Sequence, residues 1–183
     1  AFAADAEDEE ALRALVATTV SLWGRLDLLV NNAGIGIFGS METISAADWD
    51  RVMAINVRAP FVLSREAIPH LAARDRAWII NVASVVAHKG YENQTLYGAS
   101  KHALLGMSKA LGRELHARGV RVHVISPGGV DTDLVAEARP DLDRSILIQP
   151  DAIADAVAYL LALPPSAAVD EICIRRDGST PWA

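Results

Sequence analysis

The sequence predicts an α/β fold in which a doubly wound parallel β-sheet is covered by helices on both faces. Short, continuous apolar runs, typical of strands buried on both sides, alternate with longer segments of helical periodicity. Polar or glycine-rich segments follow three of these runs, and ligands of such sheets bind at the carboxyl ends of the strands. With 183 residues the chain is one domain's worth, so we assign residues 1–183 to a single domain.

The first half of the chain predicts two strands and two helices. Residues 2–6 resemble the end of a strand that runs into a turn, and an acidic start at residues 7–10 opens a helix whose apolar spacing continues to Val20. Residues 28–30 form a buried strand that ends in a turn at 31–34. Ser45 and Asp48 form a variant of the capping box, so a helix should begin there, bend at Pro60 and continue to about Ala73.

The second half continues the alternation. Strands are predicted at 77–83, 121–125 and 169–175, and helices at 96–118 and 150–163. Gly119 should end the first of these helices and Pro150 should begin the second. Residues 131–149 are polar and lack clear periodicity. The predicted order is β-α-β-α-β-α-β-α-β, without internal repeats.

Composition limits the classes of function. Half of the residues are apolar (51%) and 22% are charged, but no apolar run reaches the roughly 18 residues of a membrane helix. The net charge of −6 and the lack of a Lys/Arg cluster argue against nucleic acid or an anionic membrane as partner. Small-molecule chemistry is favoured. The single Cys173 cannot form an internal disulfide, which fits a cytoplasmic protein, and its apolar, alternating surroundings predict a buried thiol.

A glycine-rich segment invites a nucleotide-binding interpretation that we reject. Residues 34–39 match G-x-G-x-x-G, but a phosphate-binding loop must lead directly into a helix N-terminus, and Ser40 to Ser45 intervene here. Two interpretations remain open: a flexible turn, or a surface where backbone passes close to a cofactor or substrate.

Tyr97 and Lys101 are the first candidates for chemistry. They are spaced i and i+4 in a helical segment, so their side chains share one face. An ammonium held beside a phenol should lower the phenol's pKa from its usual ~10 toward neutrality, because the positive charge favours the phenolate. Taken alone the pair is a weak signal, since any surface helix can carry Tyr and Lys one turn apart.

The combined pattern is far more specific. In order, the chain carries Asn31-Asn32-Ala33-Gly34, an Asn56 inside a helix, Ser84 at a strand end, Tyr97-x-x-x-Lys101 thirteen residues later, and Pro127-Gly128. These residues resemble the short-chain dehydrogenase/reductase family over essentially the whole chain. The resemblance implies a Rossmann-like fold, NAD or NADP as cofactor, and hydride transfer to or from a carbonyl or secondary alcohol.

The resemblance also implies residue roles. Tyr97 is the general acid or base, Ser84 hydrogen-bonds the substrate oxygen, and Lys101 lowers the pKa of Tyr97 and binds the nicotinamide ribose. Asn56 holds a water that relays protons toward Lys101. Further cofactor contacts are implied for Asp5 and Ala6 at the adenine, for Asn31, Ala33 and Gly34 along the cofactor, and for Pro127, Gly128, Val130 and Thr132 at the carboxamide. Thr132 has an equally good interpretation as a helix N-cap.

The chain departs from the family pattern at its start. The glycine-rich phosphate loop T-G-x-x-x-G-x-G is absent, and with it the first two strands, whose ends would indicate the choice of nucleotide. In the family the first strand lies at the centre of the sheet, and its loss would leave buried backbone groups unpaired. We therefore expect the real molecule to be longer than a chain that begins at Ala1, a hypothesis that an intact mass near 19.6 kDa would contradict.

Several further expectations concern substrate and assembly. Apolar residues near the site (Ile35, Phe38, Val86, Tyr91 and Leu134) predict a substrate with an apolar group, as for a 3-oxoacyl or general ketone reductase. The alternative is a nucleotide-binding sensor or scaffold without turnover.

The histidines show no metal-ligand spacing, so we predict no catalytic metal. His102 and His116 have surface or interface positions as their default interpretation, whereas His88 is placed where it could face substrate. The resemblance also implies a homodimer or homotetramer formed through the helix after Tyr97 and through residues 169–182, where Trp182 would suit an interface.

Overall fold

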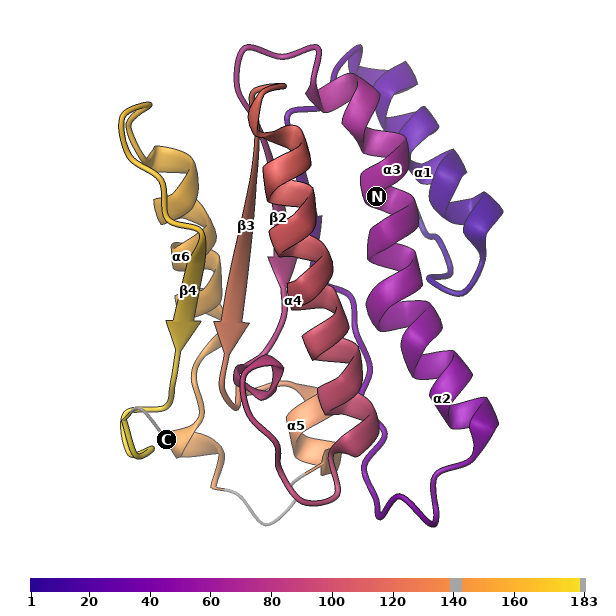
Figure 1. The fold of residues 1–183 in the computed structure, drawn as a ribbon, viewed down its shortest axis with the longest axis vertical. Coiled ribbons are helices and arrows are strands. Elements are labelled where there is room, and N and C mark those ends of the chain that lie inside the picture. The colour runs from indigo at the N-terminus through magenta and orange to yellow at the C-terminus, as the bar shows by residue number, and fades with distance from the viewer. Residues whose placement is uncertain (139–142, 182–183) are drawn as a thin grey trace.

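The computed structural model describes residues 1–138 and 143–181, and it confirms the predicted fold class. Four parallel strands form one sheet in chain order, β1 (Leu28–Asn31), β2 (Ala77–Val82), β3 (Val120–Pro127) and β4 (Glu171–Ile174). Figure 1 shows that the strand arrowheads point to the same end of the molecule, where α5 (Asp133–Ala138) and the loops that follow the strands lie. Functional side chains are therefore expected at that end.

Helices cover both faces of the sheet. On one face lie α3 (Ala59–Leu71) and α4 (Thr95–His116), and on the other lies α6 (Pro150–Ala162). The helix α1 (Glu9–Trp23) packs on α3 through Leu12, and α2 (Ala46–Met53) leads into α3. The fold is thus doubly wound, as the alternation of strands and helices predicts.

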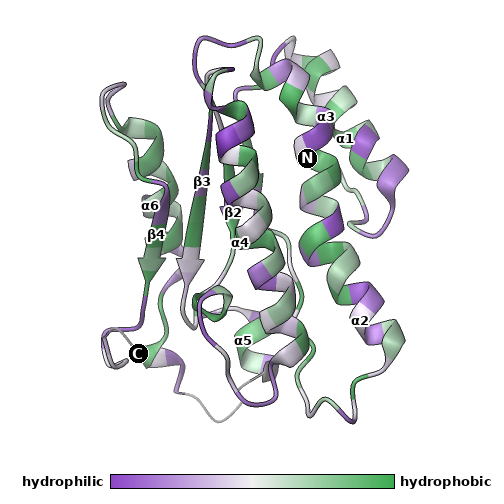
Figure 2. Ribbon diagram, in the orientation of Figure 1, coloured by the Kyte–Doolittle hydropathy of each residue, from purple (hydrophilic) through white to green (hydrophobic). Residues whose placement is uncertain are grey.

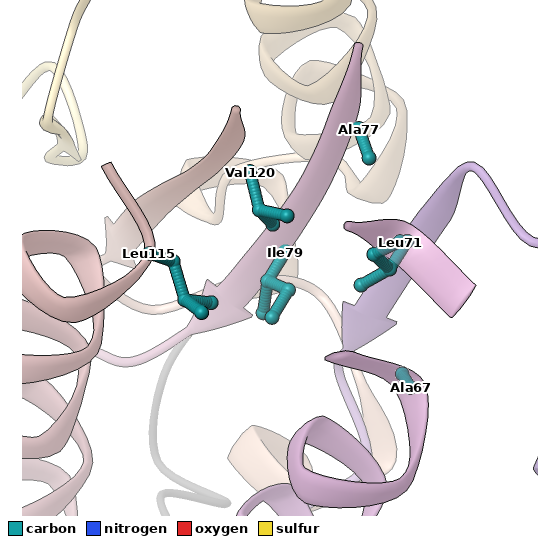
Figure 3. Packing of buried hydrophobic residues seen from close by; sticks show 6 residues of the cluster. All are labelled: Ala67, Leu71, Ala77, Ile79, Leu115 and Val120. Carbon is teal, nitrogen blue, oxygen red and sulfur yellow. The ribbon is translucent and has the colours of Figure 1, made fainter. Parts of the chain in front are cut away.

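The two faces of the sheet are packed differently. The α3/α4 face holds a cluster of fully buried side chains, shown in Figure 3: Ala67, Leu71, Ala77, Ile79, Leu115 and Val120. On the α6 face the fully buried side chains are Ile80, Ile125 and Leu160, and most of the others there are only partly buried. Figure 2 shows α6 as largely hydrophobic along its length. Because neighbouring strand residues point to opposite faces, Ile79 and Ile80 anchor one cluster each.

Local signals place the helix ends where the sequence predicts them. The Asp8 side chain accepts hydrogen bonds from the Glu10 and Ala11 amides at the start of α1. Ser45 and Asp48 form a complete capping box at the start of α2. Gly119, at φ +75°, adopts the left-handed conformation just after α4, and Pro150 occupies the first turn of α6. These ends follow from side-chain chemistry that is local in sequence.

The bend predicted at Pro60 takes the form of a π-helical turn at Ala54–Arg58, between α2 and α3. Pro60 has no N–H to donate to the carbonyl of Asn56, four residues earlier. The Ala59 amide instead bonds the Ala54 carbonyl, five residues back. Single π-turns of this kind are frequent at functional sites, and this one contains Asn56.

Three expectations for the fold are wrong. Residues 2–4 form no strand, because no neighbouring strand among the described residues can pair with them, although the turn at Ala6 and Glu7 is present. Cys173 is exposed, because it lies on β4, which pairs with β3 alone among the described strands. The predicted order has no helix at 131–149, but that region contains α5 and a 3-10 turn at Arg144–Ile146. The interface predicted for Trp182 lies outside the described residues.

β1 has an open edge in the structure. It pairs with β2 alone among the described strands, and Val30 is 38% exposed. This is the edge where the family pattern places the first strand. In the described residues, no helix combines the length and the apolar character that a membrane crossing requires.

Candidate active site

A cavity of about 590 Å³ opens at the carboxyl ends of β1, β2 and β3. Residues from all three strand ends line it, together with α4, α5 and α6. Its walls contain Val30, Asn32, Ala33, Gly34, Val82, Ala83, Ser84, Tyr97, Lys101, Pro127, Gly128, Val130, Thr132, Leu134, Val135, Pro150, Ile153, Ala154 and Val157. Most of the residues predicted for the site therefore meet in one cavity, as the topology of a parallel sheet requires.

Ser84 is buried where the chain leaves β2. Its extended backbone (φ −173°, ψ 161°) caps the 3-10 turn at Val85–Ala87, where its hydroxyl accepts a hydrogen bond from the Val86 amide at 3.3 Å. The same hydroxyl lies 3.3 Å from the Pro127 carbonyl, to which it donates. Ser84 is thus fixed between the ends of two neighbouring strands, with its oxygen at the cavity wall.

Tyr97 lies in the first turn of α4 and faces Ser84. Burial raises the pKa of the Tyr97 phenol, and a side-chain hydrogen bond with Ser84 offsets only part of that effect. The prediction of a lowered pKa is therefore wrong for this arrangement. The Lys101 ammonium lies over the Tyr97 ring, 5.7 Å from its centroid. The Phe38 ring packs against the other part of the Tyr97 surface, with ring centroids 5.5 Å apart.

Lys101 is almost completely buried, with 4% of its surface exposed. Its Nζ donates to the Val82 carbonyl at 3.0 Å, at the end of β2. Burial lowers the pKa of Lys101 to about 8. Burial of an ammonium costs folding free energy. Strongly shifted pKa values of this kind are concentrated at functional sites.

Asn56 fixes the loop after β1 against the helices. Its side chain accepts from the Ile35 amide at 2.9 Å and donates to the Ile35 carbonyl at 2.9 Å and to the Ser100 hydroxyl at 3.0 Å. A Cβ on Gly34 would come within 3.3 Å of Asn56 Oδ1 and 3.4 Å of Lys101 Nζ. Glycine at this position lets the loop lie close to both side chains.

Asn31 lies beneath the cavity instead of lining it. Its amide nitrogen donates to Asn81 at 2.7 Å, and the Asn81 amide donates to the Ser108 hydroxyl at 2.8 Å. Ser108 in turn donates to the Leu104 carbonyl inside α4 at 2.7 Å. This buried polar chain crosses from β1 through β2 to the helix that carries Tyr97 and Lys101, so Asn31 supports the site from below.

The segment after β3 lines the cavity as predicted. Gly128 donates its amide to the Ile174 carbonyl at 2.7 Å, which holds the segment against β4. Thr132 immediately precedes α5, where its carbonyl accepts from the amides of Val135 and Ala136. Its hydroxyl donates to the Val130 carbonyl at 3.3 Å. Thr132 therefore both borders the cavity and stands at the helix start, so the two interpretations of this residue are compatible.

Other candidates lie elsewhere. Asp5 closes a turn by accepting the Glu7 amide at 2.9 Å, and Ala6 packs near Leu12; neither lines the cavity. Of the five apolar residues predicted to face substrate, Leu134 alone lines it. His88 points to Glu171, with 2.6 Å between Nε2 and Oε1, and is not part of the wall. His102 and His116 are exposed on α4. The helix required directly after the glycine segment 34–39 begins only at Ala46, as our rejection of the phosphate-loop interpretation expects.

The sequence analysis missed several residues of the site. Asn32 lines the cavity in place of Asn31, and strand alternation, which turns adjacent residues to opposite faces, is a signal that could have shown this. The α6 residues Pro150, Ile153, Ala154 and Val157 also line it. No sequence signal separates these from ordinary helix residues that face the sheet.

Fold and site together define a class of protein. A doubly wound parallel sheet carries a buried Ser84, a partly buried Tyr97 and a buried Lys101 on the walls of one cavity at the carboxyl ends of its strands, an arrangement suited to proton transfer beside a bound ligand. Comparison with known proteins gives the family. The model of the short chain dehydrogenase family matches residues 1–143, so the chain belongs to that family.

Relatives and solved structures agree with this assignment. Nodulation protein G of Azospirillum brasilense is 38% identical over 164 residues, which cover 85% of this chain and 67% of that protein. The 3-oxoacyl-[acyl-carrier-protein] reductase FabG of Thermotoga maritima is 31% identical over 162 residues, 84% of this chain and 65% of that protein. A crystal structure of a metagenomic short-chain oxidoreductase in complex with NADP matches with a TM-score of 0.80 and 33% identity, over 94% of this chain and 71% of that one. The chain thus spans about two-thirds of the length of these relatives.

Proposed function

We propose that the protein is an oxidoreductase that moves hydride between a nicotinamide nucleotide, NAD or NADP, and a carbonyl compound or its secondary alcohol. The observation that carries this proposal is the convergence of Ser84, Tyr97 and Lys101 on one cavity at the strand ends. Membership of the short-chain dehydrogenase family and the similarity to an NADP-bound oxidoreductase support it.

The cavity fits the nicotinamide half of such a nucleotide. Gly34 leaves room beside the buried Lys101 amine, where a Cβ would crowd the site, and Lys101 can donate to ribose hydroxyls there. Ala33, Pro127, Gly128, Val130 and Thr132 line the walls around that place. When bound, the nucleotide supplies or accepts the hydride. Asn31 contributes from below through the polar chain, and we keep Asp5 and Ala6 as proposed contacts at the adenine end.

Tyr97 and Ser84 would handle the proton. In reduction the Tyr97 hydroxyl gives its proton to the substrate oxygen while Ser84 donates a hydrogen bond to the same atom, which stabilises the developing charge. The raised pKa of Tyr97 keeps the phenol protonated at neutral pH, as an acid must be. In oxidation Tyr97 has to act as a base, so the positive charge of Lys101 becomes important once the phenolate forms.

Asn56 would hold the water that passes protons toward Lys101. Its side chain is engaged by Ile35 and Ser100, so the proposal places the water at its backbone carbonyl. Pro60 cannot donate to that carbonyl, which leaves the usual α-helical bond unmade. The π-turn therefore supports the proposal that the Asn56 carbonyl is free to accept a hydrogen bond from a water.

The substrate should carry an apolar group. The apolar lining of the cavity includes Leu134, Val135, Ile153 and Val157, and Lys101 is the one cationic residue among the described lining residues. A 3-oxoacyl or general ketone reductase fits this chemistry, and the relative from Thermotoga maritima supports it. We further propose a cytoplasmic homodimer or homotetramer that pairs through α4 and residues 169–182, which light scattering would test.

Substitution of Tyr97 tests the proposal. The purified protein should oxidise NADPH or NADH in the presence of a ketone, and Tyr97→Phe should lose at least about a hundredfold in kcat because it has no proton to give. Tyr91→Phe is the matched control, since the Tyr91 side chain is exposed and lies outside the cavity wall. Equal turnover by wild type and Tyr97→Phe would refute the mechanism. Nucleotide binding without turnover on any ketone would favour the sensor or scaffold alternative.

A further inference from the structure

A second group of chemically active side chains lies outside the cavity. His88, Glu171 and Cys173 each offer one ligand atom, and these atoms all lie within 4.8 Å of one another. His88 Nε2 is 2.6 Å from Glu171 Oε1, and Cys173 Sγ is 3.8 Å from the same oxygen. His88 is more than eighty positions away from Glu171 and Cys173 in sequence, so the fold brings it to them.

The supporting structure holds these donors on rigid elements. Glu171 and Cys173 are alternate residues of β4 and therefore point to the same side of the sheet. His88 follows the 3-10 turn at Val85–Ala87 and bonds back to the Val85 carbonyl through its amide. Ser126, fully buried on β3, donates its hydroxyl to Glu171 Oε1 at 2.6 Å. A hydrogen bond of this kind orients a ligating carboxylate in metal sites.

We propose that His88, Glu171 and Cys173 bind a divalent cation of the zinc class at the β4 edge of the sheet. Imidazole nitrogen, carboxylate oxygen and thiolate sulfur are the three protein ligands that Zn²⁺ takes. The soft sulfur and the imidazole select against Mg²⁺ and Ca²⁺, which prefer oxygen. Three protein ligands leave the fourth tetrahedral position to water.

The distances are compatible with this ligand set. Zinc bonds of about 2.0–2.3 Å in a tetrahedron place donor atoms roughly 3.3–3.7 Å apart. The separation of 3.8 Å between Cys173 Sγ and Glu171 Oε1 is just above this range, and the 2.6 Å between His88 Nε2 and Glu171 Oε1 has to open by less than about 1 Å. The cation would replace the hydrogen bond that now joins imidazole and carboxylate.

Protons compete with the cation at this site. Burial and the neighbouring carboxylate of Glu171 raise the pKa of the Cys173 thiol. Although burial opposes it, hydrogen bonds from Ser126 and His88 keep the pKa of Glu171 below its usual value, and the charge of Lys109 on α4 acts in the same direction. Binding therefore expels the thiol proton, and the apparent affinity should increase with pH until the thiol is ionised.

The position of the site gives it a consequence for the cavity. Ser84 and His88 stand at the two ends of the same 3-10 turn, so a cation on His88 would anchor that turn to β4. The inference does not depend on the proposed oxidoreductase activity, because its ligands lie outside the cavity wall and its test measures metal binding directly.

Titration of the reduced, chelator-treated protein with Co²⁺ tests the proposal. Wild type should take up one Co²⁺ per chain with a thiolate-to-cobalt charge-transfer band in the near ultraviolet, and Zn²⁺ should abolish that band by displacement. Cys173→Ser should lose the band, and His88→Gln and Glu171→Gln should each weaken binding at least about tenfold. The matched controls are His116→Gln and Glu114→Gln, exposed residues of α4 that should bind like wild type.

Two outcomes would overturn the proposal. One is the absence of a charge-transfer band in wild type, and the other is a band that persists at wild-type affinity in Cys173→Ser. In either case His88 and Glu171 form only a hydrogen-bonded link between the turn and β4. The ligands are partly or wholly exposed in the single chain, so the variants should fold, and circular dichroism of each apo variant checks this before titration. Because Glu171 and Cys173 belong to residues 169–182, proposed above to pair two copies, light scattering checks that each variant keeps the oligomeric state of wild type.

Discussion

The two faces of the sheet differ in how completely their side chains are buried. The α3/α4 face carries fully buried aliphatic side chains and, closer to the strand ends, the polar chain from Asn31 to Ser108. The α6 face is covered by one helix, and many of its apolar side chains stay partly exposed. The acid/base residues Tyr97 and Lys101 belong to the first face, whereas the second supplies apolar lining to the cavity. The fully buried cluster includes Ala77 and Val120, the first residues of β2 and β3, so it lies toward the amino ends of the strands, away from the cavity at their carboxyl ends.

The largest expected effect compares the faces directly at adjacent positions of β2. Ile79 and Ile80 are both fully buried, on the α3/α4 face and the α6 face respectively. Ile79→Ala should cost about 4 kcal/mol of unfolding free energy, because its fully buried neighbours cannot move to fill the space that the truncated side chain leaves. Ile80→Ala should cost about 2–3 kcal/mol, since partly exposed neighbours can adjust.

Urea denaturation of both variants measures this difference. Equal losses of unfolding free energy in the two variants would show that the two faces are equally well packed. A change in the denaturant slope would indicate an altered denatured state, so the midpoints should be compared only at equal slope.

The next effect concerns the charge that the α3/α4 face buries. Burial lowers the pKa of Lys101 to about 8 from the usual 10.5. Between these values the unfolded chain binds the proton and the folded chain does not, so stability should rise as the pH increases from about 8 toward 10.5. Below about pH 8 the fold carries the full desolvation cost, roughly 3 kcal/mol at most.

Lys101→Met should remove this cost together with the amine. The variant should be more stable than wild type at neutral pH by up to about 3 kcal/mol, less the hydrogen bond to Val82, and the two should converge as the pH rises. Thermal unfolding at about pH 7 and about pH 9 checks both points. Lys109→Met, at an exposed position of α4, is the control. A variant less stable than wild type at neutral pH would show that Lys101 stabilises the fold.

A third, smaller effect tests the polar chain. Asn81→Ala removes the acceptor of the Asn31 amide and the donor to Ser108, and leaves Asn31 with the 3.4 Å contact to Ser64 alone. The loss should be about 2 kcal/mol, because a buried polar group is left poorly paired. Asn32→Ala, at an exposed asparagine one residue from Asn31, should leave stability within about 0.5 kcal/mol. Chemical denaturation of Asn81→Ala and Asn32→Ala measures the two losses of unfolding free energy. Equal losses would mean that the hydrogen bonds of Asn81 contribute no more to stability than an exposed amide does.

The sequence could predict the helix ends and the catalytic residues, but not the pKa of Tyr97. Capping residues and Pro150 give the helix ends, because their chemistry is local. Ser84, Tyr97 and Lys101 follow from spacing and the family resemblance. The direction of the Tyr97 pKa shift could not be predicted, because it depends on how deeply the fold buries the phenol and on the hydrogen bond with Ser84.

Contacts between residues far apart in the sequence could not be predicted either. The exposure of Cys173 depends on β4 being the last strand of the described sheet, which no local pattern shows. The pairing of His88 with Glu171 joins residues 83 positions apart. Residues 2–6 resemble the end of a strand that runs into a turn, yet a strand needs a partner, and none of the described strands pairs there.

The smallest expected effect asks whether α1 contributes to the strength of the α3/α4 face. Because α1 packs on α3, its influence on the sheet should be indirect. Asp8→Ala removes the side chain that accepts the Glu10 and Ala11 amides, which should cost about 1 kcal/mol. Turnover should not change, since α1 has no residue in the cavity wall. Differential scanning calorimetry and steady-state assays measure the two quantities, with Asp8→Asn as the control that keeps an acceptor. A loss of activity in Asp8→Ala at temperatures well below unfolding would mean that α1 transmits its position to α3 and the site, and the contrast between the faces would then have to include this third layer.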